Sequence, residues 1–391
     1  MSDADTPTAP TRPPLAVSLA AFVSSFDRFA VSPLLVLVAT DLDVPLAQAL
    51  GIASAYFLAY GVSQPLWGMI SDRVGRIRLM RWALIAAAIV GVVAALAPSL
   101  TVLIVARTLG GAFYGAIVPT SLTYVGDTVD EEHRQPALAD LMAAIAVGTA
   151  LATALAGIIA DVIDWRVVFA IPSALAVLSV IGLTRVPESH REERTGVLQT
   201  IRTSLGDRWV LVVIALVFVE GAAVLGVLTL LAPALQSLGV GAAVAGLATA
   251  AYGVGVIVTS RLVGPLSRRL PMPGLMAIGG SATVIAFALL TLQLSIATVI
   301  IAAFLLGATW SFLHSSLQTW STSVLPRVRG TVVSLFAGFL FAGSALGAWA
   351  GGVLGDHGEW TLLFAITAVL ALVLTVAVVL SRRAYERPRR A

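Results

Sequence analysis

The sequence of 391 residues contains no lysine and no cysteine, so all 24 of its basic residues are arginine. Without lysine the chain cannot bind ATP through a P-loop or form a Schiff base, and without cysteine it has no disulfide or thiol chemistry. Charged residues make up only 12% of the chain, about half their share in soluble domains. These absences exclude several classes of enzyme and point to a membrane protein, with no cofactor and no metal site expected.

Apolar runs of spanning length recur along the whole chain, and none shows the short alternation of a β-barrel strand. We therefore expect an all-α membrane protein with twelve transmembrane helices. The expected spans cover residues 15–38, 46–70, 79–97, 99–125, 135–160, 165–186, 208–236, 241–264, 272–292, 295–323, 329–354 and 360–381.

The longest polar break, which falls between the sixth and seventh spans, divides the chain into two halves. We expect an N-terminal six-helix bundle over residues 15–186 and a C-terminal one over 208–381, joined by a cytoplasmic linker at 187–207. Residues 1–14 are polar and rich in Pro and Thr, which predicts a disordered tail and not a signal peptide. Residues 382–391 form a basic tail.

The arginines predict the orientation of the chain, because cytoplasmic loops of membrane proteins are enriched in positive charge. With both termini cytoplasmic, Arg166 is the one arginine on the outside, and Arg28 and Arg107 lie within the membrane. All the others are cytoplasmic. We therefore expect a multi-pass protein of the cytoplasmic (inner) membrane.

The two halves resemble one another in sequence. The segment "GIIADVIDWRVVFAI" matches "GGVLGDHGEWTLLFAI" 195 residues later, with Gly, Asp, Trp and Phe aligned, and Gly148 matches Gly343 at the same spacing. Two parallel six-helix repeats predict a pseudo-two-fold axis along the membrane normal, with a binding site between the halves.

The segment "GMISDRVGRIR" (residues 68–78, called the latch loop below) follows the second span. It closely resembles the signature loop of the major facilitator superfamily, and the matching residues include Gly68, Asp72, Arg73, Gly75 and Arg76. We expect Gly68 to permit close approach of a neighbouring helix and Gly75 to permit a tight turn. The resemblance implies that Asp72 meets the start of helix eleven and helps to hold the cytoplasmic side shut.

The run "LLVLVATDLDV" and the compact twelve-helix form are similar to the drug:proton antiporter branch of that superfamily. The resemblance implies a proton-coupled secondary transporter, not an enzyme, that exports small amphiphilic molecules by alternating access. Its expected partners are a small-molecule substrate, protons and the lipid bilayer. We expect a monomer that binds no nucleic acid.

Four charged residues lie within the expected spans: Asp27, Arg28, Arg107 and Glu220. Charges inside a bilayer are costly and mark functional sites. Asp27 adjoins Arg28 and is expected to pair with Arg107, whereas Glu220 has no basic residue near it in sequence. Because a nearby cation favours the ionised form of a carboxyl group, we expect Glu220 to carry the coupling proton, with Asp27 as the alternative carrier.

The resemblance also implies that helices one, four, seven and ten line the central cavity, and these helices carry buried polar faces. The expected substrate-binding residues are Arg28, Arg107, Tyr60, Tyr114, His314 and Gln318. The motif "DRFAVSP" is also similar to one in organic-anion symporters, which makes a proton-coupled organic-anion symporter the alternative. A channel or a non-transporting sensor is a third possibility, which the two intact repeats disfavour.

Overall fold

The structure is a computed structural model that describes residues 11–189 and 197–386. Across these two ranges the chain is helical and contains no strand, and twelve of its segments are long and apolar enough to cross a membrane. Their bounds agree with the expected spans to within a turn or so. The predicted all-α fold with twelve spans is therefore confirmed.

The first half of the chain forms spans one to six. They comprise α1 (Leu15–Phe29), η1 (Ser32–Leu34) and α2 (Leu35–Asp41); α3 (Leu46–Ala49) and α4 (Gly51–Val74); α5 (Arg76–Ala95); α6 (Leu100–Tyr114) and α7 (Ile117–Thr128); α8 (Glu131–Val162); and α9 (Trp165–Leu183). A short helix, α10 (Val197–Leu205), lies within the segment expected to be a plain linker.

The second half forms spans seven to twelve. They comprise α11 (Arg208–Glu220), η2 (Gly221–Gly226) and α12 (Leu231–Gln236); α13 (Ala242–Ser267); α14 (Met272–Leu292); α15 (Ile296–Thr309), η3 (Trp310–His314) and α16 (Ser315–Val324); η4 (Pro326–Val328) and α17 (Arg329–Asp356); and α18 (Trp360–Glu386). Helix α18 continues through residues 382–386, which we had assigned to the basic tail.

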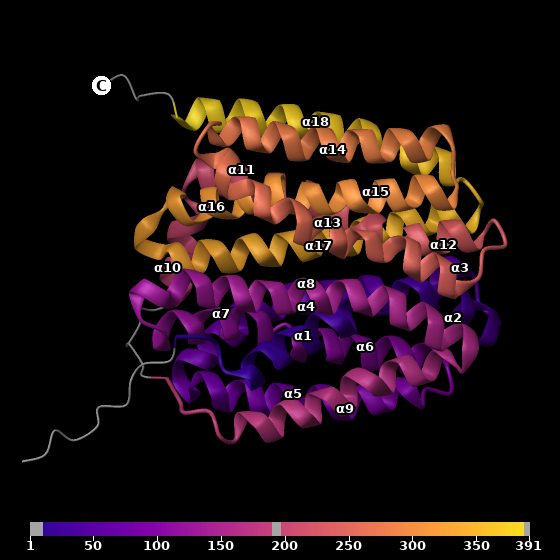
Figure 1. Ribbon diagram of the computed structural model, residues 1–391, viewed down its shortest axis with the longest axis horizontal. Helices are drawn as coiled ribbons and strands as arrows, with labels where there is room; N and C mark the ends of the chain where they lie inside the picture. Colours follow the sequence, from indigo (N-terminus) through magenta and orange to yellow (C-terminus); the bar gives the residue numbers. More distant parts are fainter. Residues whose placement is uncertain (1–10, 190–196, 387–391) are drawn as a thin grey trace, which may run out of the picture.

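The two halves lie one above the other as two layers of helices (Figure 1). Helices α1 to α9 form the lower layer, and α11 to α18 form the upper one. Helix α10 and the last turns of α18 lie at one end of the molecule, called the terminal end below. The turn between α2 and α3 lies at the opposite end together with α12, and we call this the far end.

Polar side chains fix where several spans begin. Asp207 accepts hydrogen bonds from the amides of Trp209 and Val210 at the start of α11, and Ser295 and Thr298 form a capping box on α15. Such caps satisfy amide groups that have no partner inside the helix. They explain why these spans begin where the apolar runs begin.

The internal repeat has the same structural role in both halves. A Cβ atom added to Gly148 on α8 would lie 2.6 Å from the backbone oxygen of Phe22 on α1. In the second half, Gly343 on α17 approaches the backbone oxygen of Phe218 on α11 in the same way. Helix five therefore packs on helix one, and helix eleven on helix seven, through glycines one repeat apart.

We expect Gly343→Ala to destabilise the protein by about 1–3 kcal/mol, because the added methyl group would overlap the backbone of α11. Gly264→Ala on α13 is the matched control, since an added Cβ there would meet nothing within 4 Å. Alanine favours helix over glycine by about 1 kcal/mol, so the control should be neutral or stabilising. Thermal unfolding of the purified variants measures both, and equal unfolding temperatures would contradict the packing argument.

Spans one, four, seven and ten are interrupted near their middles. Span one breaks at Ala30 and Val31, and span four breaks at Gly115 and Ala116. Spans seven and ten contain the π-helical segments η2 and η3. Interrupted helices free backbone groups at membrane depth, and π-bulges often occur at functional sites. The four interruptions thus mark the region in which the buried charges lie.

Candidate functional site

Asp27 and Arg107 form a buried ion pair in the first half. Arg107 Nη1 donates to Asp27 Oδ1 at 2.7 Å, and Nη2 donates to the backbone oxygen of Asp27 at 2.9 Å. Each residue is only 2% exposed. Asp27 lies in the last turn of α1, where carbonyl groups have no partner inside the helix. Arg107 therefore pairs with both the carboxylate and a carbonyl group, and the predicted pairing is confirmed.

Two aromatic rings hold the guanidinium of Arg107 in place. Its central carbon lies 4.4 Å from the ring centre of Tyr56 and 5.0 Å from that of Phe169. Aromatic faces attract cations most strongly where water is absent. Arg107 is thus surrounded by groups of its own half, and the predicted contact with substrate stays a prediction. Tyr56, one helical turn before Tyr60, was missed by the sequence analysis.

Glu220 and His314 form a second buried pair, in the other half. His314 Nδ1 lies 3.2 Å from Glu220 Oε2. His314 is 6% exposed and Glu220 is 0% exposed. Glu220 is the last residue of α11 before the π-helical η2, and His314 is the last residue of η3. The sequence analysis considered only the residues near Glu220 in the sequence, and so it missed His314, which reaches Glu220 from span ten.

The Glu220–His314 pair has the composition of a proton site. A carboxyl group and an imidazole at hydrogen-bond distance can share one proton, and which atom carries it depends on the charge around them. Trp310 stacks on His314 with ring centres 3.6 Å apart, which fixes the plane of the imidazole. Glu220 Oε1 is buried and has no hydrogen-bond partner within the described residues, so the carboxyl group is only half satisfied.

Arg28 lies at the boundary between the two halves. Its guanidinium carbon lies 4.9 Å from the ring centre of Phe29, 5.1 Å from Tyr60 and 5.3 Å from Phe341 on α17. The rings of Tyr60 and Phe341 are in edge contact, with centres 4.6 Å apart. Arg28 and Tyr60, both predicted to bind substrate, are therefore brought together, and Phe341 joins them from the second half.

Two other predicted substrate residues, Tyr114 and Gln318, differ in their surroundings. The hydroxyl group of Tyr114 donates to the backbone oxygen of Pro172 on α9 at 3.3 Å, inside the first half. Gln318, one turn beyond His314, is exposed. Within the described residues neither side chain forms a hydrogen bond or an ion pair with the charge pairs described above, and the roles of both in substrate binding stay predictions.

The latch loop is held within the first half by a residue that the sequence analysis missed. Glu188, just after α9, accepts hydrogen bonds from the backbone amides of Ile77 and Arg78 at 2.9 and 3.1 Å. A carboxylate at the first turn of α5 complements the positive end of that helix. Gly75 has φ of +102°, which glycine adopts readily, and this supports the predicted tight turn.

The charges of the latch loop form a chain of contacts. Arg76 Nη1 lies 2.6 Å from Asp72 Oδ1, and Arg76 Nε lies 3.3 Å from Asp127 Oδ2 on α7. The contact of Asp72 with helix eleven stays a prediction, and Arg73 is exposed. The predicted close approach at Gly68 is wrong in this structure, because an added Cβ atom there would meet nothing within 4 Å.

The two halves are joined at the far end by a pair of acids one repeat apart. Asp161 at the end of α8 accepts from the amide of Ala243 in the first turn of α13, at 3.3 Å. Asp356 at the end of α17 accepts from the amide of Ala47 in α3, at 3.4 Å. Each acid thus caps a helix of the opposite half, and the two contacts are related by the internal repeat.

Removing both acids, as Asp161→Ala with Asp356→Ala, should loosen the far end, since losing a helix cap costs about 0.5–2 kcal/mol. Spin labels at Gln48→Cys and Glu359→Cys, both exposed at that end, should report a broader and longer distance distribution. The chain has no cysteine of its own. Asp164→Ala is the control, because Asp164 caps α9 within its own half. An unchanged distribution in the double variant would count against these caps as closing contacts.

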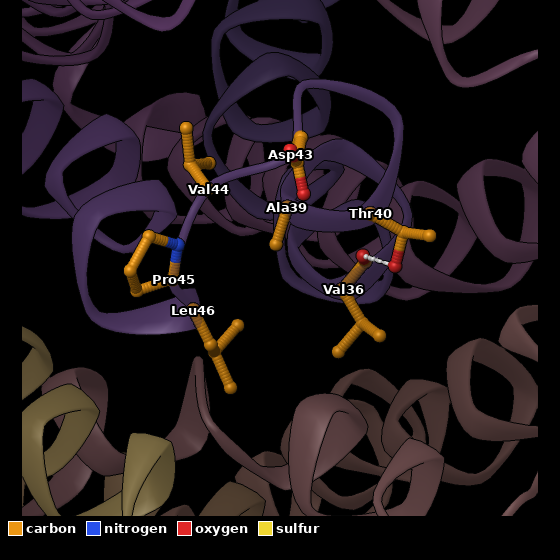
Figure 2. A pocket seen from close by; sticks show the side chains of 7 residues that line it. All are labelled: Val36, Ala39, Thr40, Asp43, Val44, Pro45 and Leu46. Atoms are coloured by element: carbon orange, nitrogen blue, oxygen red, sulfur yellow. Dashed lines mark hydrogen bonds between the residues drawn. The ribbon is translucent and has the colours of Figure 1, made fainter.

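A surface hollow lies at the turn between α2 and α3, away from the buried pairs (Figure 2). Thr40 in its wall donates to the backbone oxygen of Val36 in its own helix, and Asp43 is its one charged residue. The hollow is lined by Val36, Ala39, Thr40, Asp43, Val44, Pro45 and Leu46. Because it contains a single charge and no convergent polar groups, we assign no site to it.

Comparison with known proteins gives consistent results. The family model described as Major Facilitator Superfamily matches residues 17–234 and, in a second match, residues 213–391. An uncharacterized MFS-type transporter of Bacillus subtilis, YfhI, is 25% identical over 93% of this chain and 92% of its own length. The multidrug export protein EmrB of Escherichia coli K12 is 28% identical over 46% of this chain and 35% of its own.

Among solved structures, a D-xylose–proton symporter has a TM-score of 0.76 at 18% identity, covering 93% of this chain and 96% of its own. At that identity the likeness concerns the fold alone. It matches the arrangement of two six-helix halves described above.

Proposed function

Because the chain belongs to the Major Facilitator Superfamily and is an integral membrane transporter, we propose that it couples the export of small amphiphilic molecules to the entry of protons. The proposed location is the cytoplasmic (inner) membrane, with the terminal end facing the cytoplasm and the protein acting as a monomer. The arginine distribution of the sequence supports this orientation. Export is supported by the partial likeness to EmrB.

The observation that carries the proposal is the buried Glu220–His314 pair between two π-helical segments. A carboxyl group buried at membrane depth beside an imidazole is an arrangement typical of proton relays in transporters. The Asp27–Arg107 pair occupies the matching region of the first half, where the carboxylate already has a permanent cation. Glu220 is therefore the better proposed proton carrier, and Asp27 the alternative.

Alternating access is supported by the contacts between the halves. The caps formed by Asp161 and Asp356 lie at the far end, and Gly157 and Gly352 also approach the opposite half there. At the terminal end, added Cβ atoms on Gly68 and Gly264 would meet nothing within 4 Å. Close contacts between the halves are thus present at the far end, as expected of a transporter closed on that side.

Reconstituted liposomes with an imposed pH gradient test the proposal. The probes are ethidium, an amphiphilic cation, and 1-naphthylacetate, an amphiphilic anion, and an internal pH-sensitive dye follows proton movement. Export of either probe coupled to proton entry supports the proposal. Uptake of 1-naphthylacetate together with protons supports the organic-anion symporter, for which the position of Arg28 is the favourable observation. Flux of neither probe under the gradient would contradict both transport functions.

A further inference from the structure

We propose that Arg28 binds an acidic head group, so that the transported amphiphile is an organic anion such as a carboxylate. This inference rests on the proposed transport function and names the substrate class of its central site. Three observations support it. Arg28 has no anionic partner inside the described part of the chain, a cavity lies beside it, and the walls of that cavity come from both halves.

Arg28 is a cation without an anionic partner inside the described part of the chain. The two nearby acids are already paired, Asp27 with Arg107 and Glu220 with His314. Arg28 Nε is buried and has no hydrogen-bond partner among the described residues. The three aromatic rings around the guanidinium offset part of the cost of burying it. Within the described residues no hydrogen bond joins these rings to the guanidinium, in whose plane a carboxylate would bind.

The cavity beside Arg28 offers a second unused donor. Thr153 Oγ1 on α8 is also buried without a partner in the ranges described, and both Arg28 and Thr153 line this cavity. Three neighbouring threonines already donate to carbonyl groups of their own helices: Thr149, Thr229 and Thr249. The buried donors without a partner at this cavity are therefore Arg28 Nε and the hydroxyl group of Thr153, which together suit an oxyanion.

The cavity has room for about one water molecule in this structure. Its walls come from both halves, with Arg28 and Thr153 from the first and Thr229 and Tyr252 from the second. Separation of the halves would therefore enlarge it. The rings of Phe29, Tyr60 and Phe341 adjoin the guanidinium and provide apolar contacts for the body of the ligand. This combination favours an anionic head group on an apolar body over a small inorganic anion.

Matched acids and amides test the inference on the purified full-length protein. The pairs are 1-naphthylacetate with 1-naphthylacetamide and octanoate with octanamide, which differ chiefly in charge. Binding is measured from the rise in unfolding temperature with ligand concentration. We expect each acid to bind about tenfold or more tightly than its amide, as charged hydrogen bonds imply. Equal binding of acid and amide, or no binding of either acid, would overturn the inference.

Variants of Arg28 identify the group responsible. Arg28→Gln should reduce the preference for the acid to about one, and Arg28→Lys, which retains the charge, should keep part of it. Arg166→Gln is the matched control, because Arg166 is a surface arginine already paired with Asp41, and it should keep the full preference. A preference unchanged in Arg28→Gln would overturn the assignment. Where that variant does not fold, the comparison of acid with amide on the wild-type protein still tests whether the site prefers an anion.

Two further measurements separate this inference from its alternatives. Stabilisation by sodium chloride equal to that by 1-naphthylacetate at the same ionic strength would indicate a site for a small anion and overturn the amphiphile. Preferential binding of the acids without gradient-driven flux would uphold the Arg28 site and contradict the proposed transport function. Gradient-driven export of ethidium without any preference for the acids would uphold the proposed transport function and contradict the Arg28 site.

Discussion

Glu220→Gln is expected to reduce pH-gradient-driven transport to the leak of protein-free liposomes, while exchange of substrate across the membrane without a gradient continues. Glutamine keeps the shape and the hydrogen-bonding capacity of a protonated glutamate, so it can still contact His314. It cannot release a proton. The variant should therefore pass through the proton-loaded states of the cycle and fail at the step that returns the proton.

The measurement compares gradient-driven flux with exchange of radiolabelled substrate in the same liposomes. Glu359→Gln is the matched control, because Glu359 is an exposed acid outside the membrane spans, and both activities should be unchanged. Asp27→Asn should instead reduce binding or folding, since it removes the carboxylate that Arg107 contacts. Normal gradient-driven flux in Glu220→Gln would make Asp27 the proton carrier.

The sequence was sufficient to predict the spans and the Asp27–Arg107 pair because both follow from strong constraints. A bilayer sets the length of each apolar run, and a buried acid and base are each too costly to leave alone. The repeat was also predictable, since Gly148 and Gly343 align in the sequence. The structure then shows that both are sites of close helix packing.

The Glu220–His314 pair could not be predicted in the same way. The two residues are 94 positions apart, and His314 lies in a π-helical segment. A projection at 100° per residue assumes α-helical geometry, so it assigns the wrong faces to residues that follow such a segment. A polar residue beside a π-segment has no signature in a single sequence.

The latch loop shows a second limit of prediction from a single sequence. Its glycines were recognised from sequence, but Glu188, which holds the loop, lies 111 residues from Ile77. A single acid in a polar linker does not identify its partner in a sequence. Gly68 was expected to allow close packing, yet an added Cβ atom there would meet nothing within 4 Å. A transporter alternates between arrangements, so a residue required for packing in one of them can be uncovered in the other.

Arg107→Ala is expected to destabilise the protein by about 3–5 kcal/mol, because it leaves the carboxylate of Asp27 buried without a cation. The double variant with Asp27→Asn should be more stable than Arg107→Ala alone, since asparagine carries no charge that must be balanced. Part of the stability lost in Arg107→Ala comes from the contacts of the guanidinium with Tyr56 and Phe169. That part is common to both variants, so their difference reports the stranded charge.

A double-mutant cycle measures this difference from the free energy of unfolding in detergent, with wild type, Asp27→Asn, Arg107→Ala and the double variant. The ion pair of Arg166 with Asp41 provides the control cycle: its Nη1–Oδ2 distance of 2.8 Å is similar to that of the buried pair, but both side chains are at least one-third exposed. Exposed pairs couple by about 1 kcal/mol or less, whereas the buried pair should couple several times more strongly. Additive effects at Asp27 and Arg107 would mean that their contact contributes nothing to the free energy of unfolding. The sequence-based argument that expensive charges must be paired would then fail at the position where it is strongest.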